Sequence, residues 1–267
     1  MPTLHSAQTL SIEGPDAVAF AQTQFSSKVS ELATGHWQFS AWLDPQGRVR
    51  ALFHLARIDD NRLLLLLRGG DAATMADALR RFVFRSKVSI EALQTRVIAT
   101  GSALPMQQVD ATTELLSLGC GDYRMNIIDA ENGDETWHAT QLKNGWPWLP
   151  VNLLGELLPA SLSLHRLHAV AIDKGCYPGQ EIVARLHYRG GNKRHLCQLV
   201  LPGAAEPGER LCIDNRVVAQ LLNTQTMDTG CNALVVLNDD VAALAREGNL
   251  PTFDGHPAIR LTHAWSA

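Results

Sequence analysis

The stretch "DKGCYPGQEIVAR", residues 173–185, sets one cysteine between a Lys-Gly pair and a Pro-Gly turn. Pro178 fixes φ near the value required at the second position of a β-turn, and Gly179 tolerates the positive φ of the third position in a type II turn. Cys176 and Tyr177 therefore lead directly into a tight bend. We expect a side chain at the shoulder of such a bend to be accessible to solvent.

The charges and the local structure around Cys176 bear on whether its thiol is reactive. Lys174 lies two residues before it and Arg185 nine residues after it, and nearby positive charge favours the thiolate. Residues 182–188 fit a strand by their alternation and a helix by their apolar face, and only a helix starting near Gly179 would add its dipole. A lone cysteine is also commonly a small buried hydrophobe, so a reactive thiol and a packing role both stay open.

Length, charge and cysteine usage bound the class of protein. The 267 residues, 46% of them hydrophobic, suffice for one large domain or two to three smaller ones. The formal net charge of -4 gives no global basic field that would draw the chain onto nucleic acid or anionic lipid. The first residues lack the pattern of a signal peptide, and the longest aliphatic block, Leu63–Leu67, is too short to cross a bilayer. We therefore expect a cytoplasmic protein without a membrane partner.

The cysteines support the same compartment. Their number is odd and none forms a CxxC pair, which is typical of reduced thiols and not of a disulfide or zinc framework. We expect the four cysteines outside the motif to be buried; they are Cys120, Cys197, Cys212 and Cys231. His165 and His168 have a spacing that can hold a metal, but no third ligand is evident, so we expect no metal site.

The rest of the chain alternates helical and strand-like segments. We expect helices near 15–25, after an N-cap at Asp71 and near 162–172, and strands at 37–43, 48–58 and 62–67 with a turn at 44–47. After "GGNK" (190–193), short apolar runs separated by turn-forming residues predict a small all-β domain, a barrel or a sandwich, that begins near residue 192.

The motif as a whole resembles the signature of YgfZ-type folate-binding proteins, which are related to the aminomethyltransferase (T-protein) of the glycine cleavage system. "KGCYPGQEIVAR" is followed by "GGNKR", and the matching positions are Lys174, Gly175, Cys176, Tyr177, Gly179, Gln180, Glu181 and Arg185. Weaker resemblance in "FSAWLDPQGRVRALFHLAR" (39–57), "FVFRSKVSI" (82–90) and "NGWPWLP" (144–150) extends it over most of the chain.

The resemblance implies an α+β fold: a three-domain, T-protein-like cloverleaf around a central cavity, with ferredoxin-like α/β pieces and a C-terminal antiparallel β-barrel. The expected boundaries follow from it. Residues 1–46 and 112–191 would form a split first domain that carries the motif, residues 47–111 a second α+β domain, and residues 192–267 the barrel.

The resemblance also implies a function. Such proteins bind tetrahydrofolate or a derivative and support the assembly or repair of iron–sulfur enzymes, including enzymes that modify tRNA, with Cys176 as the functional thiol. Trp137 matches a tryptophan that relatives place against the folate. Ala7 stands where relatives have a second tryptophan, and Lys143 where many have a glutamate that can accept hydrogen bonds from a pterin.

The expected partners are a folate and iron–sulfur client enzymes. The basic segment 185–195 suits the glutamate tail of a folate, RNA phosphate or a solvated hinge between domains. We expect no direct contact with nucleic acid, because this segment has no aromatic platform beyond Tyr188.

The alternative functions are enzymatic. T-proteins carry a carboxylate in the strand after Gly47, and here the expected positions are Ala51 and Leu52. No group there can orient a substrate amine or handle its proton, which disfavours aminomethyl transfer. A folate-dependent one-carbon transferase or demethylase remains the alternative, as does a thiol-redox enzyme in which Cys197 approaches Cys176 in space.

Overall fold

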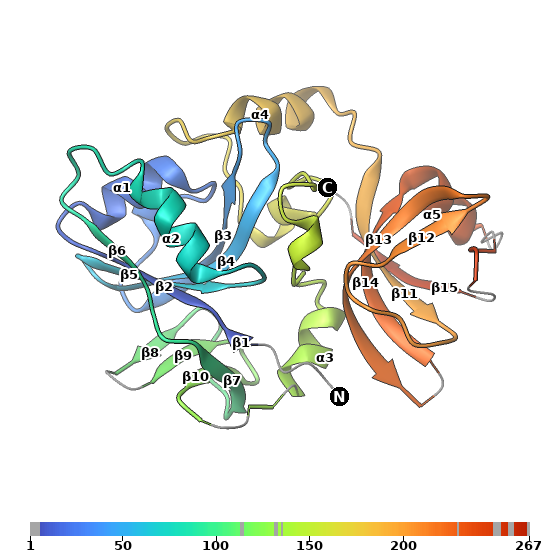
Figure 1. Ribbon diagram of the computed structural model, residues 1–267, viewed down its shortest axis with the longest axis horizontal. Coiled ribbons are helices and arrows are strands. Elements are labelled where there is room, and N and C mark those ends of the chain that lie inside the picture. Colours follow the sequence, from blue (N-terminus) through green and yellow to red (C-terminus); the bar gives the residue numbers. More distant parts are fainter. Residues whose placement is uncertain are drawn as a thin grey trace.

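The computed structural model describes residues 6–112, 115–130, 133–134, 136–228, 230–247, 252–255 and 259–265. Within these ranges the chain forms five α-helices and three five-stranded sheets in which all paired strands are antiparallel (Figure 1). The α+β class expected from the sequence is therefore confirmed.

The first sheet has the strand order β3-β4-β5-β2-β6. Its strands are β2 (Thr9–Glu13), β3 (His36–Leu43), β4 (Val49–Asp59), β5 (Arg62–Leu67) and β6 (Ser89–Ala92). Helices α1 (Ala17–Gln24) and α2 (Ala72–Arg80) cover one face and share a hydrophobic cluster with it. Asp71 caps α2 as predicted, because its carboxylate accepts a hydrogen bond of 2.7 Å from Thr74 N.

The leucine run of β5 explains how this sheet holds two cores together. Leu63, Leu65 and Leu67 belong to the cluster under the two helices, whereas Leu64 and Leu66 belong to a second cluster on the opposite face. Side chains of a strand point alternately to its two faces, so an unbroken apolar run indicates a strand that is buried on both sides.

The second sheet and the segment after it lie against that opposite face. The sheet has the order β1-β7-β10-β9-β8. Its strands are β1 (Ser6–Ala7), β7 (Arg96–Gly101), β8 (Val109–Ala111), β9 (Leu116–Gly119) and β10 (Arg124–Ile128), and it is followed by α3 (Thr136–Lys143) and α4 (Gln180–Arg189). Between these helices lie only two short 3-10 helices, η2 (Val151–Leu153) and η3 (Leu164–Leu167).

The prediction of a helix near 162–172 is therefore wrong, because only Leu164–Leu167 are helical and they form a short 3-10 helix. Ser163 and His168, which flank η3, both adopt the left-handed conformation, with φ of 51° and 53°. Left-handed residues at both ends stop a regular helix from extending in either direction.

The third sheet has the order β12-β13-β14-β11-β15. Its strands are β11 (Arg194–Leu201), β12 (Arg210–Ile213), β13 (Arg216–Met227), β14 (Gly230–Asn238) and β15 (Arg260–Ala264), and α5 (Asp239–Arg246) follows β14. No pairing among the described residues joins the edge strands β12 and β15, so the sheet is open there and a closed barrel is not found. Helix α5 was not expected; it buries Val241 and Ala242 in the core of this sheet.

The strand pairing groups the chain differently from the expected domain boundaries. The boundary at 46/47 falls inside the β3–β4 hairpin, in which Trp42 pairs with Ala51 and Leu43 with Val49. The boundary at 111/112 falls between β8 and its partner β9. The third sheet begins at Arg194, near the boundary expected at 192. The division into domains itself stays a prediction.

No helix in the described part of the chain combines the length and the apolar character needed to cross a membrane.

His54 gives the core a dependence on pH. It lies fully buried on β4, with its ring centroid 4.6 Å from that of Trp37, and neither ring nitrogen has a hydrogen-bond partner among the described residues. Burial, with a smaller contribution from Arg68, holds the pKa of His54 well below 6.5. Below pH 6.5 the unfolded chain therefore binds a proton that the native chain does not, and stability falls as pH falls.

We predict that His54→Phe removes this dependence. Between pH 7.5 and pH 5.5, the wild type should lose up to about 1.4 kcal/mol of unfolding free energy per pH unit more than the variant. Urea denaturation at both pH values measures the difference. His36→Phe, at the exposed start of β3, is the control and should behave as the wild type. Equal slopes for wild type and His54→Phe would contradict the prediction.

Candidate functional site

The cysteine motif forms the turn and the helix start that its sequence favours. Gln180 N donates a 3.2 Å hydrogen bond to Tyr177 O, and Gly179 has φ of 77° and ψ of 1°, the values of the third position in a type II turn. Gly179 is also the N-cap of α4, so residues 182–188 are helical. The strand alternative for these residues is excluded, and the loop of Cys176 runs directly into a helix N-terminus.

The turn is packed against the tip of the β3–β4 hairpin, which reaches α4 in Figure 1. A Cβ atom on Gly179 would lie 2.5 Å from Asp44 O and 2.7 Å from Gly47 Cα. A Cβ atom on Gly47 would lie 2.9 Å from Ile182 Cβ. Both glycines also have φ of +77°, which favours glycine. Two tight turns, far apart in sequence, therefore touch backbone to backbone because neither carries a side chain there.

Lys174 holds the loop to the end of α1. Its ammonium donates hydrogen bonds of 2.7 Å to Phe25 O and 2.6 Å to Ser27 O, just beyond the last turn of that helix, where a cation is favoured. Burial lowers the pKa of Lys174 to about 8. Next to it, Asp173 forms a 2.8 Å ion pair with Lys28. The contacts of Lys174 thus fix the position of the loop. That its charge favours the thiolate of Cys176 stays a prediction.

The neighbours of Cys176 are tied down in the same way. Tyr177 is buried and its hydroxyl donates to Ala171 O at 2.9 Å. Burial raises the pKa of Tyr177. The amide of Gln180 donates to Lys174 O at 3.1 Å, which closes the loop on itself. Glu181 and Arg185 are exposed on α4.

Cys176 is exposed, as its place beside the turn predicts. Among the described residues no hydrogen bond or ion pair involves its sulfur. Cys120, Cys197 and Cys231 are buried, as expected. Cys212 is only half-buried, so the expectation of full burial is wrong for this residue. A sulfur exposed to solvent contributes little to core packing, and the packing role for Cys176 is not supported.

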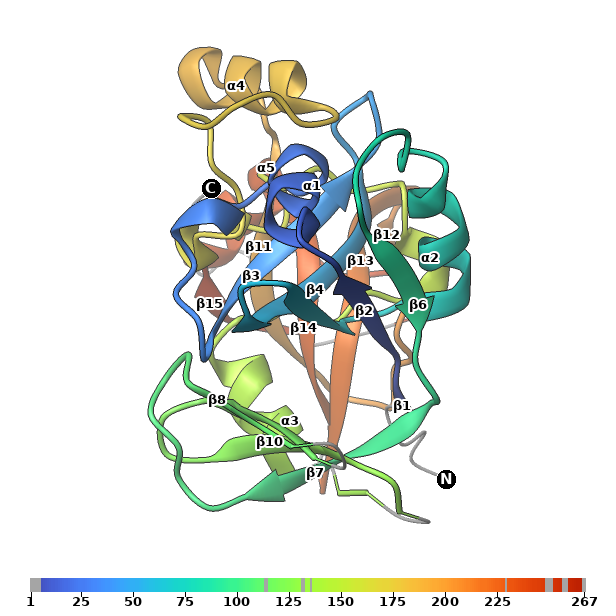
Figure 2. The same ribbon diagram turned by 90° about the vertical axis from the view of Figure 1, so that its left-hand side faces the viewer.

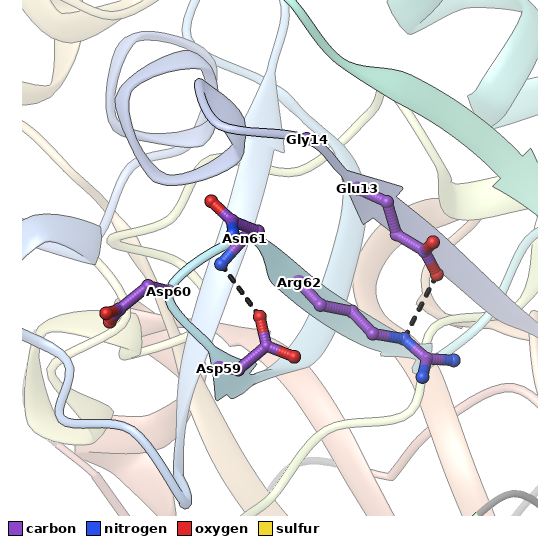
Figure 3. A pocket seen from close by; sticks show the side chains of 6 residues that line it. All are labelled: Glu13, Gly14, Asp59, Asp60, Asn61 and Arg62. Atoms are coloured by element: carbon purple, nitrogen blue, oxygen red, sulfur yellow. Dashed lines mark hydrogen bonds and ion pairs between the residues drawn. The ribbon is translucent and has the colours of Figure 1, made fainter.

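A pocket of about 480 Å³ lies beside this loop, lined by Lys28, Glu31, Gln38, His168 and residues 170–173. Cys176 is not among its lining residues. A second surface pocket lies at the β4–β5 turn (Figure 3). There Arg62 pairs with Glu13 at 3.0 Å, and Asn61 N donates to Asp59 at 2.8 Å. The ion pair joins β5 to the neighbouring strand β2, and the hydrogen bond stabilises the β4–β5 turn; we assign no function to the second pocket.

The interior holds a buried cation that sequence reasoning missed. Arg68, directly after β5, is fully buried; its Nε donates to Pro147 O at 2.7 Å and its Nη2 to Trp146 O at 2.9 Å. The guanidinium lies 4.8 Å from the ring centroid of Trp148. Among the described residues, its Nη1 has no hydrogen-bond partner and no carboxylate lies within ion-pair distance. Burial lowers the pKa of Arg68 to about 9.

Other buried polar atoms without partners lie around Arg68. They are both ring nitrogens of His54, the hydroxyl of Tyr123 and Oε1 of Gln141. Arg68 is close enough to His54 and Tyr123 to shift their pKa values, and the hydroxyl of Tyr123 lies next to the side chains of Gln141 and Cys120. We call these four side chains the interior polar cluster. Native interiors leave few such atoms unsatisfied, so the interior polar cluster is a candidate ligand site.

The positions at which a transferase carboxylate was expected adjoin this cluster. Ala51 and Leu52 are buried, and they lie in the hydrophobic clusters on opposite faces of β4. Arg68 N donates a 2.8 Å hydrogen bond to Leu52 O. At the position where the resemblance led us to expect a carboxylate in a transferase, this chain has a leucine whose carbonyl oxygen pairs with the backbone of Arg68.

Trp137 also reaches this region. It is 1% exposed, its Nε1 donates to Asp134 O at 2.7 Å, and its ring centroid lies 5.4 Å from that of Trp148. Trp148 thus lies between Trp137 and Arg68. Ala7 pairs with Arg96 in the second sheet, and Lys143 is exposed at the end of α3.

The motif and the interior polar cluster share one hydrophobic core. Tyr177 and Val183 from the motif pack in the same cluster as Trp37, Trp137, Trp146 and Trp148.

Comparison with known proteins confirms the resemblance carried by the motif. No family model matches the chain. It is 29% identical over 255 residues to an uncharacterized protein of Haemophilus influenzae, with 90% of this chain and 89% of the other covered. It is 28% identical over 270 residues to the tRNA-modifying protein YgfZ of Cronobacter sakazakii, with 86% and 82% covered.

The fold is similar to a solved structure, the glycine cleavage system aminomethyltransferase T from Bartonella henselae. The TM-score is 0.69 at 15% sequence identity, and 89% of this chain and 80% of the other are covered. This likeness shows the fold.

We predict that Gly179→Ala destabilises the protein more than the same substitution at a glycine that has the same φ but has free space around an added Cβ atom. Gly155 has φ of 78° and no atom within 4 Å of an added Cβ, so it is a matched control. Gly155→Ala should lower the free energy of unfolding by about 1–2 kcal/mol. Gly179→Ala should lower it further, because the new Cβ meets Asp44 O. Denaturant titration measures both; equal losses would mean that the hairpin contact is unimportant.

Proposed function

We propose that this protein is a folate-binding accessory factor that supports iron–sulfur enzymes, including enzymes that modify tRNA. In this proposal tetrahydrofolate or a derivative binds at the interior polar cluster, within a T-protein-like three-domain arrangement around a central cavity, and Cys176 acts as the functional thiol. The observation that carries the proposal is the buried Arg68, whose Nη1 has no partner in the described part of the chain and whose guanidinium lies against the rings of Trp148 and Phe39. The YgfZ relatives and the T-protein fold support it.

The chemistry of the interior polar cluster fits a folate. A pterin is flat and stacks on aromatic rings, and its edge carries both donors and acceptors. Arg68 Nη1 would donate to a ring carbonyl or a carboxylate oxygen. Gln141 Oε1, which is buried and accepts no hydrogen bond from the residues that the structure describes, would accept from a pterin N–H, a task that Lys143 cannot perform. Tyr123 supplies a hydroxyl that can donate or accept. Folate, when bound, supplies one-carbon carrier chemistry.

The sign of the local charge argues against aminomethyl transfer. The buried guanidinium of Arg68, a residue whose backbone N–H pairs with Leu52 O, disfavours a protonated amine in this part of the core, because like charges repel strongly where water is excluded. It favours a ligand with an anionic or carbonyl oxygen. The transferase alternative therefore lacks both the carboxylate and the charge that its substrate requires.

Cys176 supplies a thiol that a partner can reach. The loop around it is anchored through Lys174 and Tyr177, whereas the sulfur itself faces solvent. A thiolate is a nucleophile and a soft ligand for iron and copper, which suits a role toward iron–sulfur clients. The redox alternative gains no support from Cys197, because that residue is buried in β11.

We predict that the interior polar cluster sets folate affinity. Titration with tetrahydrofolate, followed by tryptophan fluorescence, should show at least about tenfold weaker binding for Arg68→Met and weaker binding for Trp137→Ala. Tyr123→Phe is the smaller change, because it removes only the hydroxyl that lies beside Gln141 and Cys120. This variant should stay folded while folate binding weakens roughly fivefold or more.

The control for this titration is Tyr188→Phe, which removes an exposed hydroxyl on α4 and should leave affinity unchanged. Wild-type affinity in both Tyr123→Phe and a folded Arg68→Met would contradict the placement of the ligand. Formation of methylene-tetrahydrofolate from an aminomethyl donor would support the transferase alternative.

We predict that Cys176 is required for function and not for folding or folate binding. In a strain that lacks its own homologous protein, Cys176→Ala and Cys176→Ser should both fail to restore iron–sulfur enzyme activity, although both variants fold and bind tetrahydrofolate. Cys212→Ser is the matched control, because it removes another thiol that is not fully buried. Full rescue by Cys176→Ala would leave the sulfur without the proposed role.

A further inference from the structure

The connection between α2 and β6 exposes two aromatic rings. Phe82 is 43% exposed and Phe84 is 86% exposed. Val83, between them, is half-buried and packs against the core under α1 and α2. The segment is thus anchored by the middle residue, while the rings on either side of it face solvent.

The same connection carries positive charges without partners. Arg81, Arg85 and Lys87 are exposed, and none forms an ion pair with a described acidic side chain. Arg80 differs, because it pairs with Asp77 at 2.5 Å. We call Arg81, Phe82, Phe84, Arg85 and Lys87 the aromatic–basic loop. It concentrates three cations on a chain whose formal net charge is -4.

The backbone of the aromatic–basic loop is held in place. Phe82 N donates to Leu79 O at 2.9 Å, and Lys87 N donates to the carboxylate of Asp16 at 2.7 Å. Asp16 is the N-cap of α1, and the other end of α1 receives the ammonium of Lys174. An eight-residue helix spans about 12 Å. Figures 1 and 2 accordingly show the α2–β6 connection on the same upper side of the molecule as α4 and the tip of the β3–β4 hairpin.

We propose that the aromatic–basic loop binds a single-stranded nucleic acid. Exposed rings stack on unpaired bases, and arginine and lysine contact the phosphates between them. Paired bases are already stacked, so a duplex offers the rings no surface. This proposal goes beyond the folate site and revises the sequence expectation. That expectation rested on the lack of an aromatic platform beyond Tyr188, whereas the fold also exposes Phe82 and Phe84.

The test is fluorescence anisotropy of a fluorescein-labelled twelve-nucleotide poly-U RNA at 50 mM salt. We expect Phe84→Ala and Phe82→Ala each to weaken binding roughly fivefold or more, since base stacking on an aromatic ring contributes strongly. Arg85→Ala should weaken binding and reduce the slope of log K against log salt by about 0.7. Leu244→Ala, 42% exposed on α5, and Arg260→Ala on β15 are matched controls and should bind as the wild type.

Three outcomes would overturn the proposal: no binding by the wild type, binding that the phenylalanine variants leave unchanged, or tighter binding to a twelve-base-pair RNA duplex. Tighter binding to a labelled polyglutamate peptide, lost in the same variants, would show that the surface fits an acidic protein instead. All of these variants should bind tetrahydrofolate as the wild type does, so the result is independent of the proposed folate site.

Discussion

The backbone contact between two glycine turns is the constraint on which the rest of the site depends. Gly179 lies at the end of the cysteine loop, and Gly47 lies in the turn between β3 and β4. Each glycine leaves room for the other turn at a place where a side chain would collide with it. Gly179 is also the N-cap of α4. The contact joins the loop of Cys176 to β4, the strand that carries His54 and adjoins Arg68. The exposed thiol and the buried cation are therefore parts of one packed unit.

Two buried cationic side chains, Lys174 and Arg68, differ in whether the protein satisfies their hydrogen bonds. Lys174 donates to two carbonyl oxygens and fastens the loop to the end of α1. Arg68 is more deeply buried, yet one arm of its guanidinium has no partner among the described residues. A buried cation whose hydrogen bonds are all made to the protein has a structural role, whereas one with an unbonded N–H needs a water or a ligand as a partner. The absence of a carboxylate at Leu52 makes an anionic or carbonyl oxygen the fitting partner.

Local rules predict local structure well here. Pro178 and Gly179 predict the type II turn, and Asp71 predicts a helix cap, because each depends on few neighbours. Periodicity could not decide between strand and helix for 182–188, since the residues fit both. Arg68 was missed because its lack of partners arises only when the segment 144–149 closes over β5. The exposure of Phe84 likewise depends on the tertiary structure and could not be read from the sequence. The boundary expected at 46/47 divides a hairpin, because it followed the resemblance and not the strand pairing.

If Arg68 keeps one N–H available for a folate, a crystal structure of the protein with tetrahydrofolate should show it. We expect an oxygen of the ligand within about 3.2 Å of Arg68 Nη1, with the ring system against the tryptophans of the core. A folate bound elsewhere, with Arg68 still without a partner or satisfied by water alone, would contradict it.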